Sequence, residues 1–209
     1  MSEKLDIEKK KCQTPEFRVS FPHLFEPHSF AGKKPQYSLT MLFPKKVDLT
    51  ALRRAAHNAA TEKWGPKEKW PKNLDMPFRD GDKPNKKGNA QPEGYAGCTF
   101  IVAKSKTRKP GVIGPVRDVD TKEFPVLTTE AEFYAGCYAR ANVLAYAYAH
   151  ESGTAGVGFN LQGVQKLRDG KEFSGNVDIQ SSFDEVITSS DDESSYDSDG
   201  EGADAGMGF

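Results

Sequence analysis

The sequence predicts a mainly β protein: an OB-type Greek-key barrel with one well-defined helix, long basic loops and a disordered acidic C-terminal tail. Three observations support this fold class. Apolar and polar side chains alternate in five segments, one segment has helical spacing, and the last stretch has few apolar side chains. We expect a flexible N-terminus at 1–13, the barrel at 14–177 and the tail at 178–209. A β-sandwich is the alternative fold.

Alternation predicts the first two strands. In FRVSFPHLF, the residues Phe17, Val19 and Phe21 share one face until Pro22 interrupts the strand. QYSLTMLF alternates over residues 36–43, and the loop between the two segments carries Lys33 and Lys34.

Later segments supply three more strands. CTFIVAKSKTRK (98–109) begins as a strand and ends in a Lys and Arg cluster. GVGFNLQ (156–162) is a strand with a bulge expected at Gly163. Asp169-Gly170 is a tight-turn dipeptide that we expect to lead into a last short strand through Phe173.

The segment CYARANVLAYAYAH (137–150) is predicted as a long strand with two different faces. One face is small and apolar: Cys137, Ala139, Ala141, Val143, Ala145 and Ala147. The other is larger and partly polar: Tyr138, Arg140, Asn142, Leu144, Tyr146 and Tyr148.

A helix is predicted in VDLTALRRAAHNAATEKWG. Asp48 can cap its start, apolar residues recur at helical spacing from Leu49 onward, and Gly65 followed by Pro66 ends it. Its expected role is structural, covering one side of the sheet.

The stretch 65–97 is punctuated by Pro and Gly throughout, and Lys or Arg alternates there with Trp70, Phe78 and Tyr95. A loop of this length inside a compact domain is uncommon and is usually functional or disordered. Its mixture of basic and aromatic side chains favours a function.

Several classes of protein are disfavoured. The sequence has no GxSxG, GxxxxGK[ST] or HExxH motif, so nothing indicates an enzyme. The three cysteines lack CxxC spacing and the four histidines are scattered, so we expect no metal site and no cofactor. No run of 18 apolar residues is present, so we expect no membrane span.

Charge is divided unevenly along the chain. From Asp178 onward there are ten acidic residues and no Lys or Arg. Residues 1–177 therefore hold all 29 basic residues against 20 of the 30 acidic ones, a net charge of +9. Such asymmetry indicates a polyanionic partner for the basic part, and nucleic acid is the commonest. The alternative is that the tail only improves solubility.

Basic residues interleaved with aromatic ones favour single-stranded DNA as the partner. An unpaired strand offers phosphates to Lys and Arg and open base faces to aromatic rings, each stack being worth about 1–3 kcal/mol. The candidate contacts from this pattern are Lys33, Lys34, Trp70, Phe78, Arg79, Lys104, Lys106, Arg108, Tyr138, Arg140, Tyr146 and Tyr148. Two alternatives to DNA contact stay open. The tyrosines could be ordinary half-buried residues of a strand, and the segment 104–109 could be a plain solvated hairpin.

One block also resembles a known family. GCYARANVLAYAYAHESGTAGVGFNLQGVQKLRDGKEFSG (136–175), together with FRVSFPHLFEP near the start, resembles a tailed-phage family of single-stranded DNA-binding proteins with an OB fold. The resemblance implies DNA-facing positions at Arg140, Lys166 and Arg168. It also implies a non-enzymatic role in phage DNA replication or recombination, in the cytoplasm of the infected bacterium.

The basic body, acidic tail and final aromatic more loosely resemble the replication single-stranded DNA-binding proteins of T7-like phages. That resemblance implies a tail that competes with DNA and contacts replication proteins such as a polymerase or helicase. The tail residues concerned are Asp191, Asp192, Glu193, Asp197, Asp199, Glu201, Asp204 and Phe209.

A different class of function stays open at this point. The body could be a protein-interaction module, or an adaptor whose tail mimics DNA, with no affinity for nucleic acid. We expect a monomer or a homodimer, and the sequence does not choose between them.

Overall fold

The computed structural model describes residues 7–29, 32, 34–85, 87–151 and 153–173, which belong to one compact unit. Lys33 and the predicted acidic tail, Phe209 included, lie outside the described residues. The labelled elements are β1 (Lys11–Gln13), β2 (Phe17–His28), β3 (Gln36–Pro44), α2 (Thr50–Trp64), the short 3-10 helix η1 (Lys67–Lys69), β4 (Arg79–Asp80), β5 (Cys98–Ser105), β6 (Gly111–Ile113), β7 (Tyr138–Ala149) and β8 (Ala155–Arg168).

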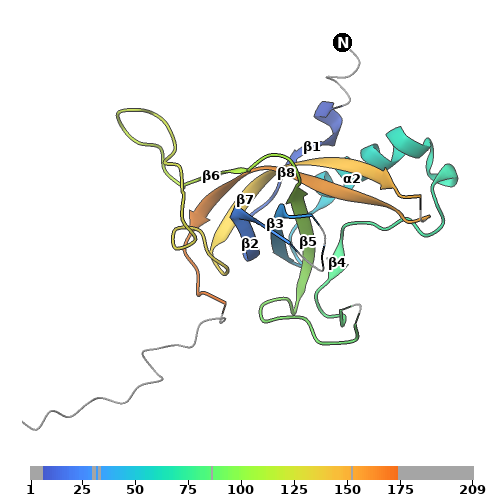
Figure 1. Cartoon of the computed structure of the whole chain (residues 1–209), viewed down its shortest axis with the longest axis horizontal. Helices are drawn as coiled ribbons and strands as arrows, with labels where there is room; N and C mark the ends of the chain where they lie inside the picture. Colours follow the sequence, from blue (N-terminus) through green and yellow to red (C-terminus); the bar gives the residue numbers. More distant parts are fainter. Residues whose placement is uncertain (1–6, 30–31, 33, 86, 152, 174–209) are drawn as a thin grey trace, which may run out of the picture. The chain divides into compact units, whose positions relative to one another are not determined.

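Five of these strands close into a ring. β7 pairs with β2, β2 with β3, β3 with β5 and β5 with β8, and β8 returns to β7 (Figure 1). Only β5 and β8 run parallel within this ring. This is the arrangement of an OB fold, so the predicted fold class is confirmed. The ring is not a regular barrel, because the β2–β7 and β5–β8 contacts each involve only two residue pairs.

The core lies inside the ring and beneath α2. The small face of β7 is buried as predicted, with Ala139, Ala141, Val143 and Ala145 at most 2% exposed. Helix α2 turns Leu52 and four alanines toward β7, β8 and β1. Small side chains on both surfaces let a helix approach a sheet closely.

The helix boundaries follow the predicted signals. The Thr50 amide donates to Asp48 Oδ1 at 2.8 Å. At the other end Gly65 has a φ of +80° and its N–H donates to Thr61 O at 2.7 Å, the left-handed termination that favours glycine.

Some local predictions differ from the structure. No strand forms at 169–173, where Arg18 instead donates to Lys171 O. The predicted bulge lies at Gln162, next to Gly163, because Asn142 pairs with Gly163 and Val143 with Leu161. Strand β1 lies within the segment expected to be flexible, because it adds to the free edge of β7 and buries Cys12. The short strands β4 and β6 carry too little alternation to be found from sequence.

The prediction that Phe21 shares one face with Phe17 and Val19 is wrong. Between the pairs Ser20–Thr40 and His23–Ser38, β2 has one more residue than β3, so a bulge forms. Phe21 lies in this bulge with a φ of +45° and is 53% exposed. Phe17 and Val19, before the bulge, are buried as predicted.

The bulge generates a stability prediction. Glycine adopts a positive φ without the steric cost, of about 1–2 kcal/mol, that an L side chain meets there. We therefore expect Phe21→Gly to leave the free energy of unfolding in urea unchanged or to raise it by up to about 1 kcal/mol. The matched control is Phe17→Gly on the same strand, which should lose about 3 kcal/mol or more because Phe17 is buried. A large loss in Phe21→Gly would show that the exposed ring is needed for packing.

Candidate nucleic-acid interface

The outer face of the ring is built from alternate residues of β3, β5 and β8. Thr40 pairs with Val102, and Ser38 pairs with Lys104. Lys104 in turn pairs with Asn160 of β8. The neighbours of these residues in sequence, such as Leu39, Ile101 and Phe159, point inward and are at most 1% exposed. OB folds bind oligonucleotides on this face of their second and third strands, which are β3 and β5 here.

One end of this face is covered by the loop 81–97. Tyr95 is 3% exposed; its hydroxyl lies 3.2 Å from Ser20 Oγ and its ring meets Phe100 edge-on at 4.9 Å. Burial raises the pKa of Tyr95, so it stays a neutral hydrogen-bonding group. Leu42, an outward residue of β3, is fully buried at this end.

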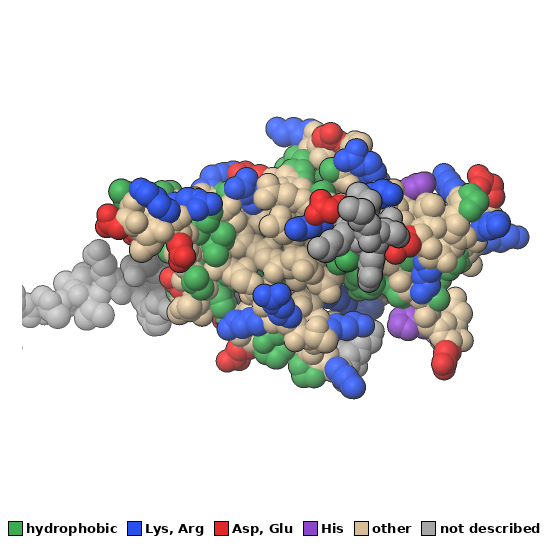
Figure 2. Space-filling view, turned by 90° about the horizontal axis from the view of Figure 1, so that it is seen from above, with side chains coloured by type: hydrophobic (Ala, Val, Ile, Leu, Met, Phe, Trp, Pro, Cys, Tyr) green, Lys and Arg blue, Asp and Glu red, His purple; other side chains and the backbone are tan. Residues whose placement is uncertain are grey.

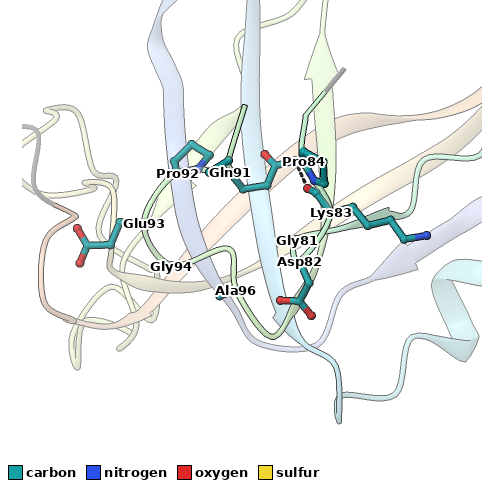
Figure 3. Close-up of a pocket in the computed structure, with 10 residues that line it drawn as sticks. Gly81, Asp82, Lys83, Pro84, Gln91, Pro92, Glu93, Gly94 and Ala96 are labelled. Atoms are coloured by element: carbon teal, nitrogen blue, oxygen red, sulfur yellow. Dashed lines mark hydrogen bonds between the residues drawn. The ribbon is translucent and has the colours of Figure 1, made fainter. Parts of the chain in front are cut away.

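The loop is held by ionic and backbone contacts. Lys45 pairs with Asp80 at 2.8 Å and with Asp82, and Asp82 Oδ1 accepts the Gly97 amide at 2.7 Å. Gln91 Nε2 donates to Lys83 O at 3.1 Å and closes the loop on itself, around a cavity of about 570 Å³ (Figure 3). Residues of this loop line the cavity, which is open to solvent, and in Figure 3 the Lys83 and Glu93 side chains point away from it in opposite directions.

The last described residues, 171–173, pack at the same covered end of the outer face. The Arg18 guanidinium lies 4.0 Å from the centroid of the Phe173 ring and donates to Lys171 O at 2.7 Å. Phe173 also packs on Gly94 of the loop, where a Cβ would lie 2.3 Å from its ring. The described chain therefore ends beside the covered end of the outer face.

The other end of the outer face is open and basic. Val102 is 37% exposed, and Lys104 is half-buried beside Ser38. Lys106 and Arg108 follow in the exposed turn after β5, and Lys34 is exposed in the β2–β3 loop. Lys and Arg side chains are spread across the width of the face shown in Figure 2, with smaller acidic groups between them.

Strand β7 carries a row of aromatic side chains beside β8, the strand at the border of the outer face. The rings of Tyr146 and Tyr148 lie 6.1 Å apart, and His150 follows 5.2 Å from Tyr148. Both tyrosines are half-exposed. Burial raises the pKa of Tyr146, and its neighbour Tyr148 raises it further, so the hydroxyl stays protonated at neutral pH.

Three of the residues predicted to contact DNA, in the loop after α2, make contacts within the described fold. Trp70 Nε1 donates to Gly65 O at 3.0 Å and its ring meets His57 at 4.9 Å. Phe78 packs edge-on against Phe159 at 6.2 Å. Arg79 pairs with both carboxylate oxygens of Asp75 at 2.7 Å. Asp75 bridges to Gly156, which brings Arg79 near Tyr148.

The remaining predicted residues cluster at the far end of the β7–β8 pair. Arg140 Nε donates to Gln165 Oε1 at 2.8 Å, and Lys166 pairs with Asp169 at 2.7 Å. The Arg168 guanidinium lies 3.4 Å from the Tyr138 ring centroid and pairs with Glu16. These four side chains thus have intramolecular partners, away from Tyr146 and Tyr148.

One exposed aromatic residue, Phe21, is not among the contacts predicted from sequence. It lies between Ser20, which faces Tyr95, and His23, which pairs with Ser38 of the outer face. The only signal in the sequence is Pro22, which marks a site where a strand is often irregular.

Metal-binding groups and membrane-spanning helices are absent from the described ranges. No group of three His, Cys, Asp or Glu side chains within them is placed to hold a metal ion. Among these same residues, no helix is long and apolar enough to span a membrane.

Comparison with known proteins decides the family. A family model described as Enterobacter phage Enc34, ssDNA-binding protein, matches residues 10–195. The chain belongs to this family. The resemblance seen in the sequence is confirmed, and since the family consists of DNA-binding proteins, so is the expectation that the chain is not an enzyme.

Relatives and solved structures agree with this assignment. Putative protein p50 of Acyrthosiphon pisum secondary endosymbiont phage 1 is 33% identical over 187 residues, covering 84% of this chain and 94% of that protein. The single-stranded DNA-binding protein of bacteriophage Enc34, in complex with ssDNA, is similar in fold with a TM-score of 0.62 at 23% identity, over 78% of this chain and 89% of that one. T7 gp2.5, a single-stranded DNA-binding protein, has a TM-score of 0.51 at 14% identity, over 81% and 97%.

The ionic contacts that hold the loop 81–97 lead to a prediction about how stability depends on pH. The hydrogen bond from Lys45, and then that from the Gly97 amide, lower the pKa of Asp82 below its ordinary 3.8. A carboxyl whose pKa is lower when folded contributes stability above its unfolded pKa and loses it as pH falls through the folded value. We expect Asp82→Asn to be less stable than the wild type at pH 7 in urea unfolding. The difference should begin to shrink as pH falls below 3.8 and should be smallest below the lowered pKa of the folded protein, where the wild-type carboxylate is also protonated.

The control for this prediction is Asp120→Asn, on the exposed turn at 118–121, which should behave like the wild type at both pH values. A difference between Asp82→Asn and the wild type that persists unchanged at low pH would contradict the ionic account of the loop.

Proposed function

We propose that this protein binds single-stranded DNA, without strong sequence preference, on the open end of the outer face of β3, β5 and β8. The observation that carries the proposal is the group of basic side chains Lys104, Lys106 and Arg108 at this end, with Tyr146 across β8 and one outward position along, on the fold and in the family of phage single-stranded DNA-binding proteins. The protein would act in phage DNA replication or recombination, in the cytoplasm of the infected bacterium.

The two kinds of side chain have different tasks. Lys34, Lys104, Lys106 and Arg108 are proposed to neutralise phosphates along one side of the strand. Neutralised phosphates release counterions, so binding should weaken steeply as salt rises. Lys33 lies in the same loop as Lys34 and is proposed to share its role.

The bases are proposed to stack on Tyr146 and Tyr148, with Phe21 as a further exposed ring on β2. Base stacking is nearly indifferent to sequence because every base has a π face. Unpaired DNA would therefore be preferred to duplex DNA, in which those faces are already stacked.

The second basic cluster, Arg140, Lys166 and Arg168, stays a candidate for the continuing path of the strand. Its members would have to exchange their present partners for phosphates. Such exchange is feasible at exposed ion pairs, which typically contribute less than about 1 kcal/mol.

The acidic stretch is proposed to compete with DNA and to recruit a replication protein such as a polymerase or helicase. Ten acidic residues after residue 177 oppose the +9 charge of the body. Phe173, which precedes this stretch, lies against Arg18 beside the covered end of the outer face. Phe209 is the proposed apolar anchor for the partner protein.

The alternative, a protein-interaction module, has one observation in its favour. The hairpin-like arm at 113–126 is closed by the pairing of Ile113 with Val126. It exposes Val116, Val119 and Val126 by 72%, 76% and 68%. Absence of oligonucleotide binding at low salt, by the full chain and by a tail-deleted form, would favour this alternative.

A charge-removal experiment tests the DNA-binding proposal. Fluorescence anisotropy with a labelled oligothymidylate should show weaker binding by Lys106→Ala/Arg108→Ala than by the wild type. The slope of log affinity against log salt should fall by about 0.7 for each phosphate that the variant no longer neutralises. The matched control, Arg117→Ala/Lys122→Ala on the arm, removes the same charge and should bind like the wild type. Equal weakening in both variants would mean that only net charge matters, which would exclude a defined groove.

A second experiment tests the tail. A full-length variant with Asp191, Asp192, Glu193, Asp197, Asp199, Glu201 and Asp204 changed to Asn or Gln should bind the oligonucleotide more tightly than the wild type. The increase in affinity should be largest at low salt, where charge repulsion and competition are least screened. Phe209→Ala should leave this affinity unchanged if the ring serves a protein partner. Equal affinities for neutralised and wild-type tails would refute the competition and leave the binding proposal intact.

A further inference from the structure

Two glycines of β8 lie directly beneath two tyrosine rings of β7. A Cβ placed on Gly158 would lie 2.8 Å from both Cζ and Oη of Tyr146. A Cβ placed on Gly156 would lie 2.5 Å from Oη and 2.6 Å from Cζ of Tyr148. Real Cβ atoms do not approach other atoms this closely, so only glycine leaves room for the rings in these positions.

The strand register explains the contact. Tyr146 pairs with Gly158 and Tyr148 with Gly156 across the antiparallel β7–β8 ladder, whose long strands run side by side in Figure 1. The Cβ of a strand residue projects away from the sheet, so a ring occupying the Cβ position lies over the backbone of the neighbouring strand. The two rings therefore extend over β8, whose Asn160 pairs with Lys104 and whose Gly156 pairs with Asp75.

Packing alone does not explain why both tyrosine rings lie over glycines. Aromatic side chains that lie over cross-strand glycines do protect the glycine backbone. A ring needed only for that purpose would be buried, whereas Tyr146 and Tyr148 both remain partly exposed. Tyr146 and Gly158 lie one outward position along β8 from Asn160, which pairs with Lys104 of the outer face.

We propose that Gly156 and Gly158 are positioning residues, which let Tyr146 and Tyr148 lie close over β8 so that the rings form a stacking platform for unpaired bases. This inference rests on the proposed single-stranded DNA binding and adds how its stacking surface is made. A side chain at either glycine would tilt the ring away from the sheet. The ring would then offer its edge, rather than its face, to a base.

Gly158 is the better position for a test. The three atoms nearest to its added Cβ all belong to the outer end of the Tyr146 side chain, which can move aside without disturbing the backbone. Gly156 also lies against the backbone oxygen of Asp75, so a substitution there would disturb the fold. Gly111 in β6 provides a matched control, because its added Cβ meets nothing within 4 Å.

The experiment compares the full-length wild type, Gly158→Ala and Gly111→Ala by fluorescence anisotropy, with an oligothymidylate and with an abasic oligonucleotide of the same length. We expect Gly158→Ala to weaken oligothymidylate binding about fivefold or more, the lower range for loss of one stack. Its affinity for the abasic chain, which offers phosphates without bases, should not change. Gly111→Ala should match the wild type with both ligands.

A double-mutant cycle shows whether the glycine acts through the ring. In the Tyr146→Leu background, Gly158→Ala should have no further effect on oligothymidylate affinity. Tyr146→Phe keeps the ring and should bind like the wild type, which tests the platform without any change at the glycine.

The outcomes separate this inference from the proposed function. Equal weakening toward the abasic chain, or an undiminished glycine effect in Tyr146→Leu, would overturn the positioning role while DNA binding stood. Loss of affinity in Tyr146→Phe equal to that in Tyr146→Leu would overturn the platform. No binding of either oligonucleotide by the wild type would instead refute the proposed function itself.

Discussion

The pairing of β7 with β8 is the interaction on which the rest of the structure depends. β7 closes the ring by contacting β8 along one edge and β2 and β1 along the other. Its inward alanines and Val143 let α2 approach the sheet, while its outward residues include Tyr146 and Tyr148. Because alternate residues of a strand point to opposite faces, one sequence of alternating character specifies both the core and the proposed stacking surface.

The position of the basic surface depends on the same ring of strands. The loop 81–97 covers one end of the outer face by packing Tyr95 on Ser20 and Phe100, and it leaves the other end open beside Lys104. Phe173 packs on Arg18 and Gly94 at this covered end.

Local patterns predicted those features that depend on neighbours in sequence. Alternation identified β7 and its two faces, and Gly65 with Pro66 identified the end of α2.

Features that depend on distant residues could not be predicted. Trp70 and Phe78 have the composition expected of stacking residues, yet they pack on His57 and Phe159, which come from α2 and β8. Phe21 obeys the alternation of β2, but the register against β3 inserts a bulge that exposes it. The glycines beneath Tyr146 and Tyr148 became meaningful only when the β7–β8 register was known.

The central claim is that single-stranded DNA lies on the open end of the outer face of β3, β5 and β8. Backbone amide NMR of the 23.0 kDa protein during titration with oligothymidylate tests it most directly. The account predicts that the largest shift changes fall at Ser38, Lys104, Tyr146, Gly158 and Asn160, with little change in the arm at 113–126. Changes confined to that arm, or to the surface of α2, would contradict it.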